Sequence, residues 1–221
     1  SPSVHVKFPV AEDWSDLNSA LAGKKIFVLI WTTTPWTLPA NLAIAFHPDF
    51  DYVAYELADG DVYIFAEKMM DALIKSGNLP QGKVIAKIAG SKFENRKARH
   101  PWIDRDSLLI LADYVTMDQG TGAVHTAPGH GSDDFYSGVK YNLPIYTPVD
   151  ERGRFTSDVE HFAGQFVFDA NPKIVNLLRE RNMLLHSENF MHSYPHCPRC
   201  HNPILFRATE QWFISMEKLR E

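Results

Sequence analysis

Short hydrophobic segments recur along most of this chain and predict a protein built mainly of β-strands. Residues 4–8 alternate between apolar and polar positions, as expected of an edge strand with one buried face. Residues 24–31 become continuously apolar after a polar start, which indicates a buried strand. A hairpin turn, ADGD, is expected at residues 58–61. The remaining predicted strands are residues 42–46, 52–57, 62–65, 84–88, 108–112, 123–126, 145–149, 153–155, 184–190 and 204–208.

Helices are predicted in three places between these strands. Residues 66–75 carry apolar side chains at helical spacing and are followed by Gly77. Ser132 is the expected N-cap of a second helix that reaches about residue 141. Asn171 and Pro172 are typical of a helix start and predict a third helix to residue 182. The predicted fold class is therefore α+β and strand-dominated, with a β-barrel core and peripheral helices.

The composition is that of an ordinary globular protein. The 221 residues are 45% hydrophobic and 22% charged, and no apolar run approaches the roughly 20 residues of a membrane helix. A net charge of −5 argues against broad, nonspecific nucleic-acid binding. One basic cluster interrupts this pattern, and it is either a solvated face or a phosphate-contacting surface: Lys92, Arg96, Lys97, Arg99 and Arg105.

The stretch GTGAVHTAPGHGSDDF, residues 120–135, predicts a strand, a glycine-rich turn and the start of a helix. This arrangement brings together His125, His130, Asp133 and Asp134, which can hold a small polar ligand with a positive group. An alternative is purely structural. Acids in a first helical turn complement the helix dipole, and His125 can be a core residue.

A second stretch, TTTPWTLPAN, follows the apolar strand at residues 24–31. Its two prolines exclude a continuous helix or a central strand. Its polar side chains are either one wall of a binding site or groups that satisfy the backbone of a connecting loop, and we favour the wall: Thr32, Thr33, Thr34, Thr37 and Asn41.

The two cysteines, Cys197 and Cys200, form a single CxxC motif. Its spacing matches half of a tetrahedral zinc site or a redox pair. Histidines adjacent to such a pair rarely point at the same metal, so His196 and His201 are weak candidates for the other ligands. We expect a half-site whose remaining ligands lie outside this chain.

Motifs of covalent or nucleotide-dependent catalysis are missing from the sequence. It has no G-x-S-x-G elbow, no P-loop and neither the HIGH nor the KMSKS signature. A hydrolase without a protein nucleophile would have to position a water molecule to attack the substrate. Asp134 would bind a substrate ammonium, His125 would bound the pocket with one hydrogen bond available, and threonine hydroxyls would face them.

Taken together, WTTTPWTLPAN (residues 31–41) and GTGAVHTAPGHGSDD (residues 120–134) closely resemble the editing domain of bacterial isoleucyl-tRNA synthetase, known as connective polypeptide 1. Residues 192–213 resemble the segment by which this insert returns to the catalytic core. The related valyl and leucyl editing domains typically read TTRPET or TTRPDT and lack a histidine at position 125, although they remain an alternative.

The resemblance implies an editing domain at residues 1–191 and a CxxC knuckle with a return segment at residues 192–221. It implies a cytoplasmic enzyme that removes valine from the 3′ end of isoleucine tRNA, as part of a synthetase that joins isoleucine to that tRNA with ATP. Its partners would be this tRNA and the rest of the synthetase, without a membrane.

The resemblance also assigns roles to individual residues. Asp134 would bind the α-ammonium, His125 and Thr37 would line the side-chain pocket, and Thr33 and Thr34 would hold the terminal adenosine or the ester. Thr32 and Asn41 would be further members of the site. Editing would use water without a cofactor, while Cys197 and Cys200 would be half of a structural zinc site in the full enzyme.

Two other functions remain open. One is a non-catalytic RNA-binding module with a zinc knuckle, supported by the CPRC motif and the basic cluster. The other is a free-standing hydrolase of small amino-acid esters, for which the sequence offers no nucleophile.

Overall fold

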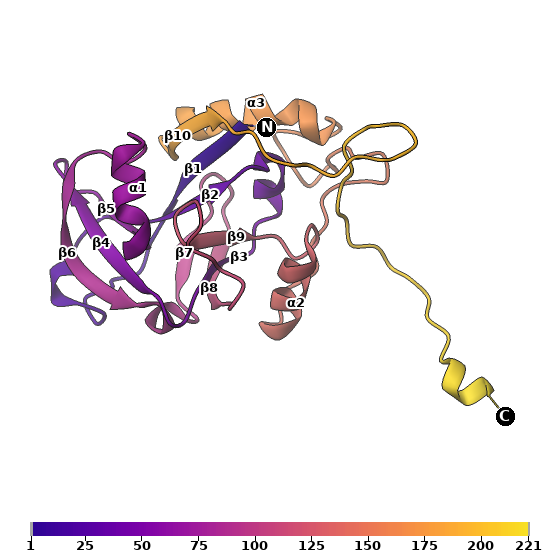
Figure 1. Cartoon of the computed structure of the whole chain (residues 1–221), viewed down its shortest axis with the longest axis horizontal. Helices are drawn as coiled ribbons and strands as arrows, with labels where there is room; N and C mark the ends of the chain where they lie inside the picture. The colour runs from indigo at the N-terminus through magenta and orange to yellow at the C-terminus, as the bar shows by residue number, and fades with distance from the viewer. Residues whose placement is uncertain (1, 221) are drawn as a thin grey trace.

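The structure is a computed structural model that describes residues 2–220, and two open β-sheets dominate it (Figure 1). The larger sheet has the order β10-β1-β2-β5-β4-β6. Its strands are β1 (Pro2–Pro9), β2 (Ile26–Thr32), β4 (Asp51–Leu57), β5 (Val62–Ala66), β6 (Gly82–Ala89) and β10 (Leu184–Asn189). The smaller sheet has the order β7-β8-β3-β9, with β3 (Ala43–Phe46), β7 (Lys97–Arg99), β8 (Asp106–Leu111) and β9 (Ala123–Thr126).

The expected β-barrel is wrong, although the α+β, strand-rich class is right. Both sheets are mixed, because β2 pairs with β5 and β3 pairs with β8 in parallel, whereas the other pairs are antiparallel. The terminal strands of each sheet do not pair with one another in the described residues, so neither sheet closes. Hydrophobic patterning predicts where strands lie, but closure depends on which distant strands pair.

Strand β1 is an interior strand and not the expected edge. It lies between β2 and β10, and His5 is registered opposite His186 of β10. Because β10 arrives from the last quarter of the chain, the local pattern of β1 carries no sign of this neighbour. The hairpin β4–β5 is confirmed as antiparallel, with the turn at residues 58–61.

Four short 3₁₀ segments and three α-helices accompany the sheets, besides a last 3₁₀ turn near the C-terminus. Their bounds are η1 (Ser19–Leu21), η2 (Pro35–Ala40), η3 (Glu67–Met69), α1 (Met70–Lys75), η4 (Gly90–Phe93), α2 (Ser132–Lys140), α3 (Val167–Glu180) and η5 (Met216–Leu219). The predicted helix at residues 66–75 is therefore divided into η3 and α1, and Gly77 follows it with a φ of 73°. The stiff loop predicted at residues 32–41 contains η2, and every residue of η2 is buried.

Two predicted helix starts are wrong. The N-cap of α2 is Gly131, and Ser132 is the first helical residue. Helix α3 begins at Val167, so Pro172 lies inside it. Val167 and Ala170 are fully buried, and their burial favours the extra turn even though Pro172 cannot donate a backbone hydrogen bond.

The predicted strands at residues 145–149, 153–155 and 204–208 do not form as such. The first two reduce to isolated bridges, one between Val149 and Phe155 and one between Arg154 and Phe166. Residues 204–208 do not pair with β10, which pairs with β1 instead. They lie against the turn before α2, where the Ala208 amide donates to the Gly129 carbonyl at 2.8 Å.

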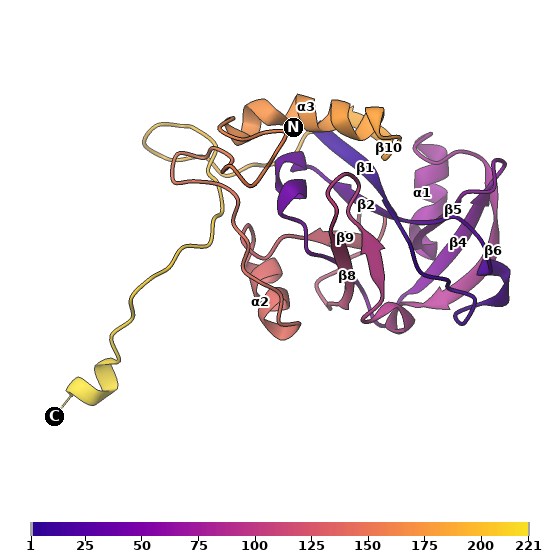
Figure 2. The same cartoon turned by 180° about the vertical axis from the view of Figure 1, so that it is seen from behind.

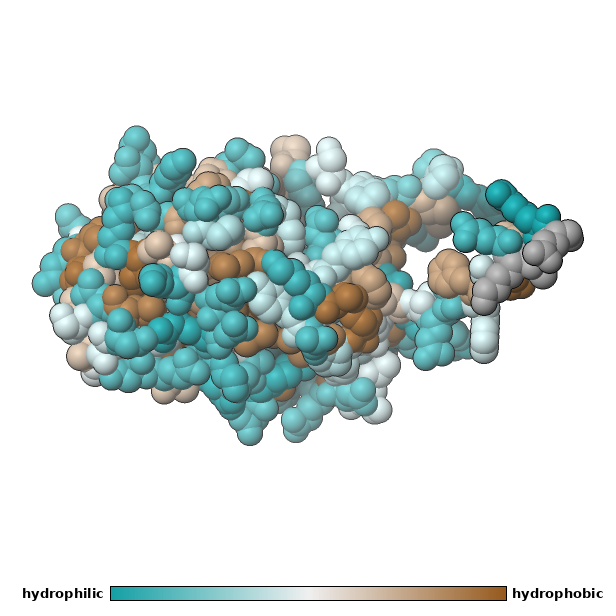
Figure 3. All heavy atoms as spheres, turned by 90° about the horizontal axis from the view of Figure 1, so that it is seen from below, coloured by the Kyte–Doolittle hydropathy of each residue, from teal (hydrophilic) through white to brown (hydrophobic). Residues whose placement is uncertain are grey.

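A continuous hydrophobic core joins the two sheets, and α3 packs against β1 and β10 in both cartoon views (Figure 2). The segment after β10 runs away from this compact body toward the C-terminus (Figure 1). The face seen from below is mostly hydrophilic, with scattered hydrophobic patches (Figure 3). None of the helices in residues 2–220 is long and apolar enough to span a bilayer.

Candidate active site

The glycine-rich stretch folds as strand β9, a tight turn and helix α2. Within the turn, the His130 amide donates to the Ala127 carbonyl at 2.9 Å. The Ala127 amide donates to Asp134 Oδ2 at 2.8 Å and so ties the turn to the first turn of α2. A Cβ at Gly129 would lie 2.3 Å from the Tyr146 carbonyl oxygen, so this close approach requires glycine.

This turn and the threonine-rich segment meet at one cavity of about 360 Å³. The structure thus brings together the two segments that the sequence singled out. The residues that line the cavity are Thr32, Thr34, Trp36, Thr37, His125, His130, Gly131, Asp134, His192, Tyr194 and Phe206.

Three of the predicted site residues do not line this cavity, and one of them, Asp133, is exposed on the first turn of α2. Thr33 lines a neighbouring cavity of about 270 Å³, which is formed mainly by residues 119–124 together with Trp31 and Tyr114. Thr32 borders both cavities. Asn41 has no exposed surface and lies behind the imidazole of His125.

A chain of hydrogen bonds fixes the imidazole of His125. Ser107 Oγ donates to Asn41 Oδ1 at 2.7 Å, so the Asn41 amide nitrogen is left to donate to the Ala43 carbonyl and to His125 Nδ1. The proton of the imidazole is therefore on Nε2, which donates to Thr37 Oγ1 at 2.7 Å. The Thr37 hydroxyl in turn donates a hydrogen bond to the Thr34 carbonyl at 2.9 Å.

This series of hydrogen bonds changes the role expected for His125. Burial, with a smaller contribution from the nearby His130, lowers the pKa of His125 to about 3. The ring is neutral near pH 7, and both nitrogens are engaged within the protein. It therefore has no hydrogen bond to offer a ligand, contrary to the expectation from sequence, and contributes a rigid wall.

Asp134 is the acidic group of the cavity. Its pKa is raised to about 6, mainly by burial and to a smaller extent by the charge of Asp133, while the hydrogen bond from the Ala127 amide opposes the rise. Within the described part of the chain, no donor reaches Asp134 Oδ1. A cationic ligand would offset the cost of this partly buried charge and occupy the free oxygen.

Three residues of the return segment complete the cavity, and the sequence did not indicate them as site residues. His192, Tyr194 and Phe206 line it, and the Phe206 carbonyl accepts a hydrogen bond from His130 Nδ1 at 3.0 Å. These residues lie more than 50 positions after the turn that they contact, and no local pattern indicates the contact.

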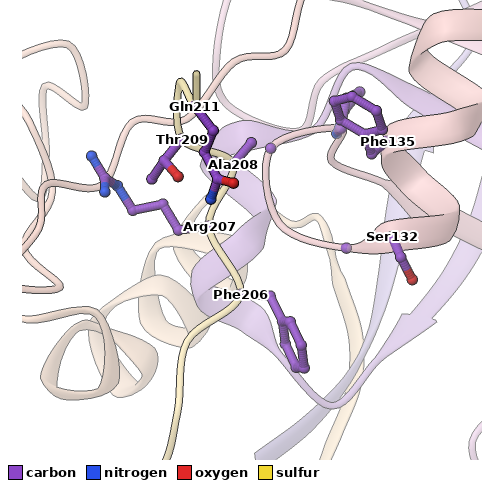
Figure 4. Close-up of a pocket in the computed structure, with 10 residues that line it drawn as sticks. Ser132, Phe135, Phe206, Arg207, Ala208, Thr209 and Gln211 are labelled. Carbon is purple, nitrogen blue, oxygen red and sulfur yellow. The ribbon is translucent and has the colours of Figure 1, made fainter. Parts of the chain in front are cut away.

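A third cavity, of about 340 Å³, adjoins the one lined by Asp134 (Figure 4). It lies between the first turn of α2, which contributes Ser132 and Phe135, and the return segment at residues 206–211. Gly131 and Phe206 border both cavities. The return segment thus forms part of the wall of both cavities.

The basic cluster mainly serves the structure itself. Arg96 pairs with Asp16, Lys97 and Arg99 pair with Asp106, and Arg99 also pairs with Asp104. These pairings support the solvated-face interpretation.

Two residues from the same region hold η2 in place, a role that the sequence did not reveal. Arg105 donates to the Pro39 carbonyl at 2.6 Å. His100 accepts backbone hydrogen bonds at Nδ1 from Trp102 and Ile103, so its Nε2 donates to the Leu38 carbonyl at 2.9 Å. The conformation that presents Thr37 to the cavity therefore depends on residues more than 60 positions away.

The CxxC motif does not form a complete metal site. Cys197 and Cys200 have free thiols in a turn closed by the bond from the His201 amide to the Cys197 carbonyl. Across residues 2–220, no group of three or more histidine, cysteine or acidic side chains is arranged to hold a metal ion. A tetrahedral zinc site needs four ligands, so the two thiols of the CxxC motif would be only part of one.

Comparison with known proteins identifies the family of this chain. Residues 64–176, just over half of the chain, match the family described as leucyl-tRNA synthetase, editing domain. The chain is 51% identical over 218 residues to an isoleucine–tRNA ligase of Geobacter sulfurreducens and 48% identical over 217 residues to one of Desulfotalea psychrophila. These alignments cover 99% and 98% of this chain but only 23% of each relative.

Solved structures show the same fold at low sequence identity. The CP1 domain GlLeuRS-CP1 superposes with a TM-score of 0.67 at 17% identity, covering 87% of this chain and all of that one. The P. knowlesi cytosolic leucyl-tRNA synthetase editing domain gives a TM-score of 0.65 at 13% identity, covering 83% and 95%. The chain therefore belongs to the family of aminoacyl-tRNA synthetase editing domains and, within it, to the editing (CP1) domains of isoleucyl-tRNA synthetase.

Proposed function

We propose that this domain hydrolyses the ester that joins valine to the 3′ end of isoleucine tRNA. Valine is one methylene smaller than isoleucine, and a pocket built for isoleucine rejects it only weakly. A second pocket that accepts valine and excludes isoleucine removes the error. The rest of the parent protein, outside this chain, would bind the tRNA and join isoleucine to it with ATP.

The observation that carries the proposal is the cavity lined by His125 and Thr37 together with Asp134, whose Oδ2 is held by the Ala127 amide and whose Oδ1 has no donor among the described residues. The α-ammonium of the valyl group would bind Asp134 Oδ1. Such a charge-assisted contact is stronger than one between neutral groups. It would also offset the burial that raises the pKa of Asp134.

The hydrogen-bond chain supplies the basis for size selection. A side chain held at both ring nitrogens cannot move aside without breaking hydrogen bonds in a buried environment. His125 would therefore exclude one additional methylene by shape. Thr37 and Asn41 would act by holding the imidazole of His125 in place. Thr37 also lines the cavity, whereas Asn41 lies behind the ring.

The two threonine-lined cavities would each bind a different part of the rest of the substrate. Thr34 borders the cavity with Asp134 and would lie beside the ester, whereas Thr33 borders the cavity of residues 119–124, which would take the terminal adenosine. Thr32 borders both and would lie at the ribose. Water would attack the ester carbonyl, the bond to the ribose oxygen would break, and that oxygen would take up a proton.

The test is deacylation of valyl-tRNA by the full-length protein that carries this domain. Asp134→Ala should abolish hydrolysis while leaving the circular dichroism spectrum unchanged. Asp133→Ala, which removes the exposed neighbouring acid, is the matched control and should retain activity. A wild-type protein that binds this tRNA but leaves the ester intact would refute the proposal and favour the RNA-binding module.

A further inference from the structure

His130 has a buried ring nitrogen without a partner at the proposed editing cavity. The side chain is 9% exposed and lines the cavity. Its Nδ1 contacts the Phe206 carbonyl at 3.0 Å, whereas no hydrogen-bonding group of the described residues reaches its Nε2. An unsatisfied buried polar atom is costly, so its presence in a ligand cavity indicates a group that the ligand is meant to meet.

The contact with Phe206 determines what this nitrogen can do. A carbonyl oxygen only accepts hydrogen bonds, so His130 Nδ1 carries the proton and donates it. Burial lowers the pKa of His130, which keeps the ring neutral near pH 7. Nε2 therefore has a lone pair and no proton, and it can only accept a hydrogen bond.

The same short turn presents a second acceptor to the cavity. Asp134 lies four residues after His130, and its Oδ1 is free while Oδ2 is held by the Ala127 amide. The turn is held by the bond between the His130 amide and the Ala127 carbonyl. One rigid segment thus offers an anionic acceptor and a neutral acceptor, which suits a cation with several N–H donors.

We propose that His130 Nε2 accepts a hydrogen bond from the α-ammonium of the aminoacyl ester and, with Asp134, orients it in the cavity. This inference rests on the proposed editing function and adds a second ammonium ligand to it. An ammonium has three donors, and Asp134 Oδ1 takes one of them. The return segment contributes by holding His130 in the tautomer that leaves Nε2 free.

Two substitutions separate the two ring nitrogens. In His130→Asn the side-chain amide can still donate to the Phe206 carbonyl, but no atom reaches the position of Nε2. In His130→Gln the side-chain amide reaches that position, while the contact with Phe206 is lost. Each variant is compared on valyl-tRNA and on the same tRNA carrying isovalerate, an ester that has neither an ammonium nor any other hydrogen-bond donor at the α-carbon.

The expected result is that His130→Asn lowers kcat/KM for valyl-tRNA by about tenfold or more, the size typical of a hydrogen bond to a charged group. It should leave the rate for the isovaleryl ester, which has no donor for Nε2, nearly unchanged, and His130→Gln should retain most activity on valyl-tRNA. An equal loss on both esters would assign Nε2 to the attacking water and overturn the inference, as would no loss on either. If the wild-type protein hydrolyses neither ester, the editing function itself fails.

Discussion

Asp134 should make this domain less stable at neutral pH than it would be with a neutral side chain. Burial raises the pKa of Asp134 from an ordinary value of 3.8 to about 6. A raised carboxyl pKa means that the folded state binds the proton more tightly than the unfolded state. Below about pH 4 the group is protonated in both states and has no cost. The cost develops as the pH rises from about 4 to 6, and it is complete above that range.

The magnitude follows from this shift. About 1.4 kcal/mol per pKa unit gives an upper limit of about 3 kcal/mol above pH 6. The carboxylate is only partly buried, so solvent screening reduces this to about 1–2 kcal/mol. Asp134→Asn should therefore increase the free energy of unfolding by about this amount at pH 8 and by almost nothing at pH 4.

The control is Asp133→Asn in the same first turn of α2. Both substitutions remove a negative charge near the helix N-terminus, which costs about 0.3–1 kcal/mol. Only Asp134 accepts the Ala127 amide, and the oxygen of an asparagine can still accept it. The difference between the two variants therefore removes the helix-dipole contribution and leaves mainly the burial of the Asp134 charge, since the repulsion between the two acids is relieved in both.

Urea unfolding of this chain and both variants, followed by circular dichroism between pH 4 and pH 8, measures the effect. We expect the Asp134→Asn curve to rise above the Asp133→Asn curve as the pH increases through 4 to 6. The reasoning is wrong if the two variants have equal stability at pH 8, or if a gain at pH 8 persists unchanged at pH 4.

Other predictions concern the proposed editing reaction and the basic cluster. The kcat/KM for valyl-tRNA should fall as the pH is lowered through about 6, because protonation of Asp134 removes the ammonium ligand; a pH-independent rate between 5 and 7 would contradict this. His125→Ala should admit the isoleucyl ester, measured as deacylation of isoleucyl-tRNA, and retained discrimination would argue against a steric wall. Asn41→Ala should lower the free energy of unfolding by about 1–3 kcal/mol, because it leaves buried partners unsatisfied; a denaturation midpoint equal to the wild type would exclude that role. Arg96→Glu should leave tRNA affinity and its salt dependence unchanged, because the pairing with Asp16 shows the guanidinium engaged within the domain; a weaker, more salt-sensitive complex would restore the phosphate-contact interpretation.

Local sequence was sufficient for features that depend on neighbouring residues. The buried strand β2, the β4–β5 hairpin and the strand–turn–helix of residues 120–135 were all predicted, because apolar patterning and glycine placement act over a few positions. The chemistry of the site was also readable, since a carboxylate and a row of hydroxyls are properties of the residues themselves.

Contacts between distant segments determined everything else. Pairing with β10 made β1 an interior strand, and in the described residues the terminal strands of each sheet do not pair with one another, so no barrel closes. Burial raised the pKa of Asp134. Hydrogen bonds with Asn41 and Thr37 engage both ring nitrogens of His125. Residue 206 set the tautomer of His130 from 76 positions away. Strand partners, desolvation and hydrogen-bond occupancy exist only once the chain has folded, so no local pattern in the sequence encodes them.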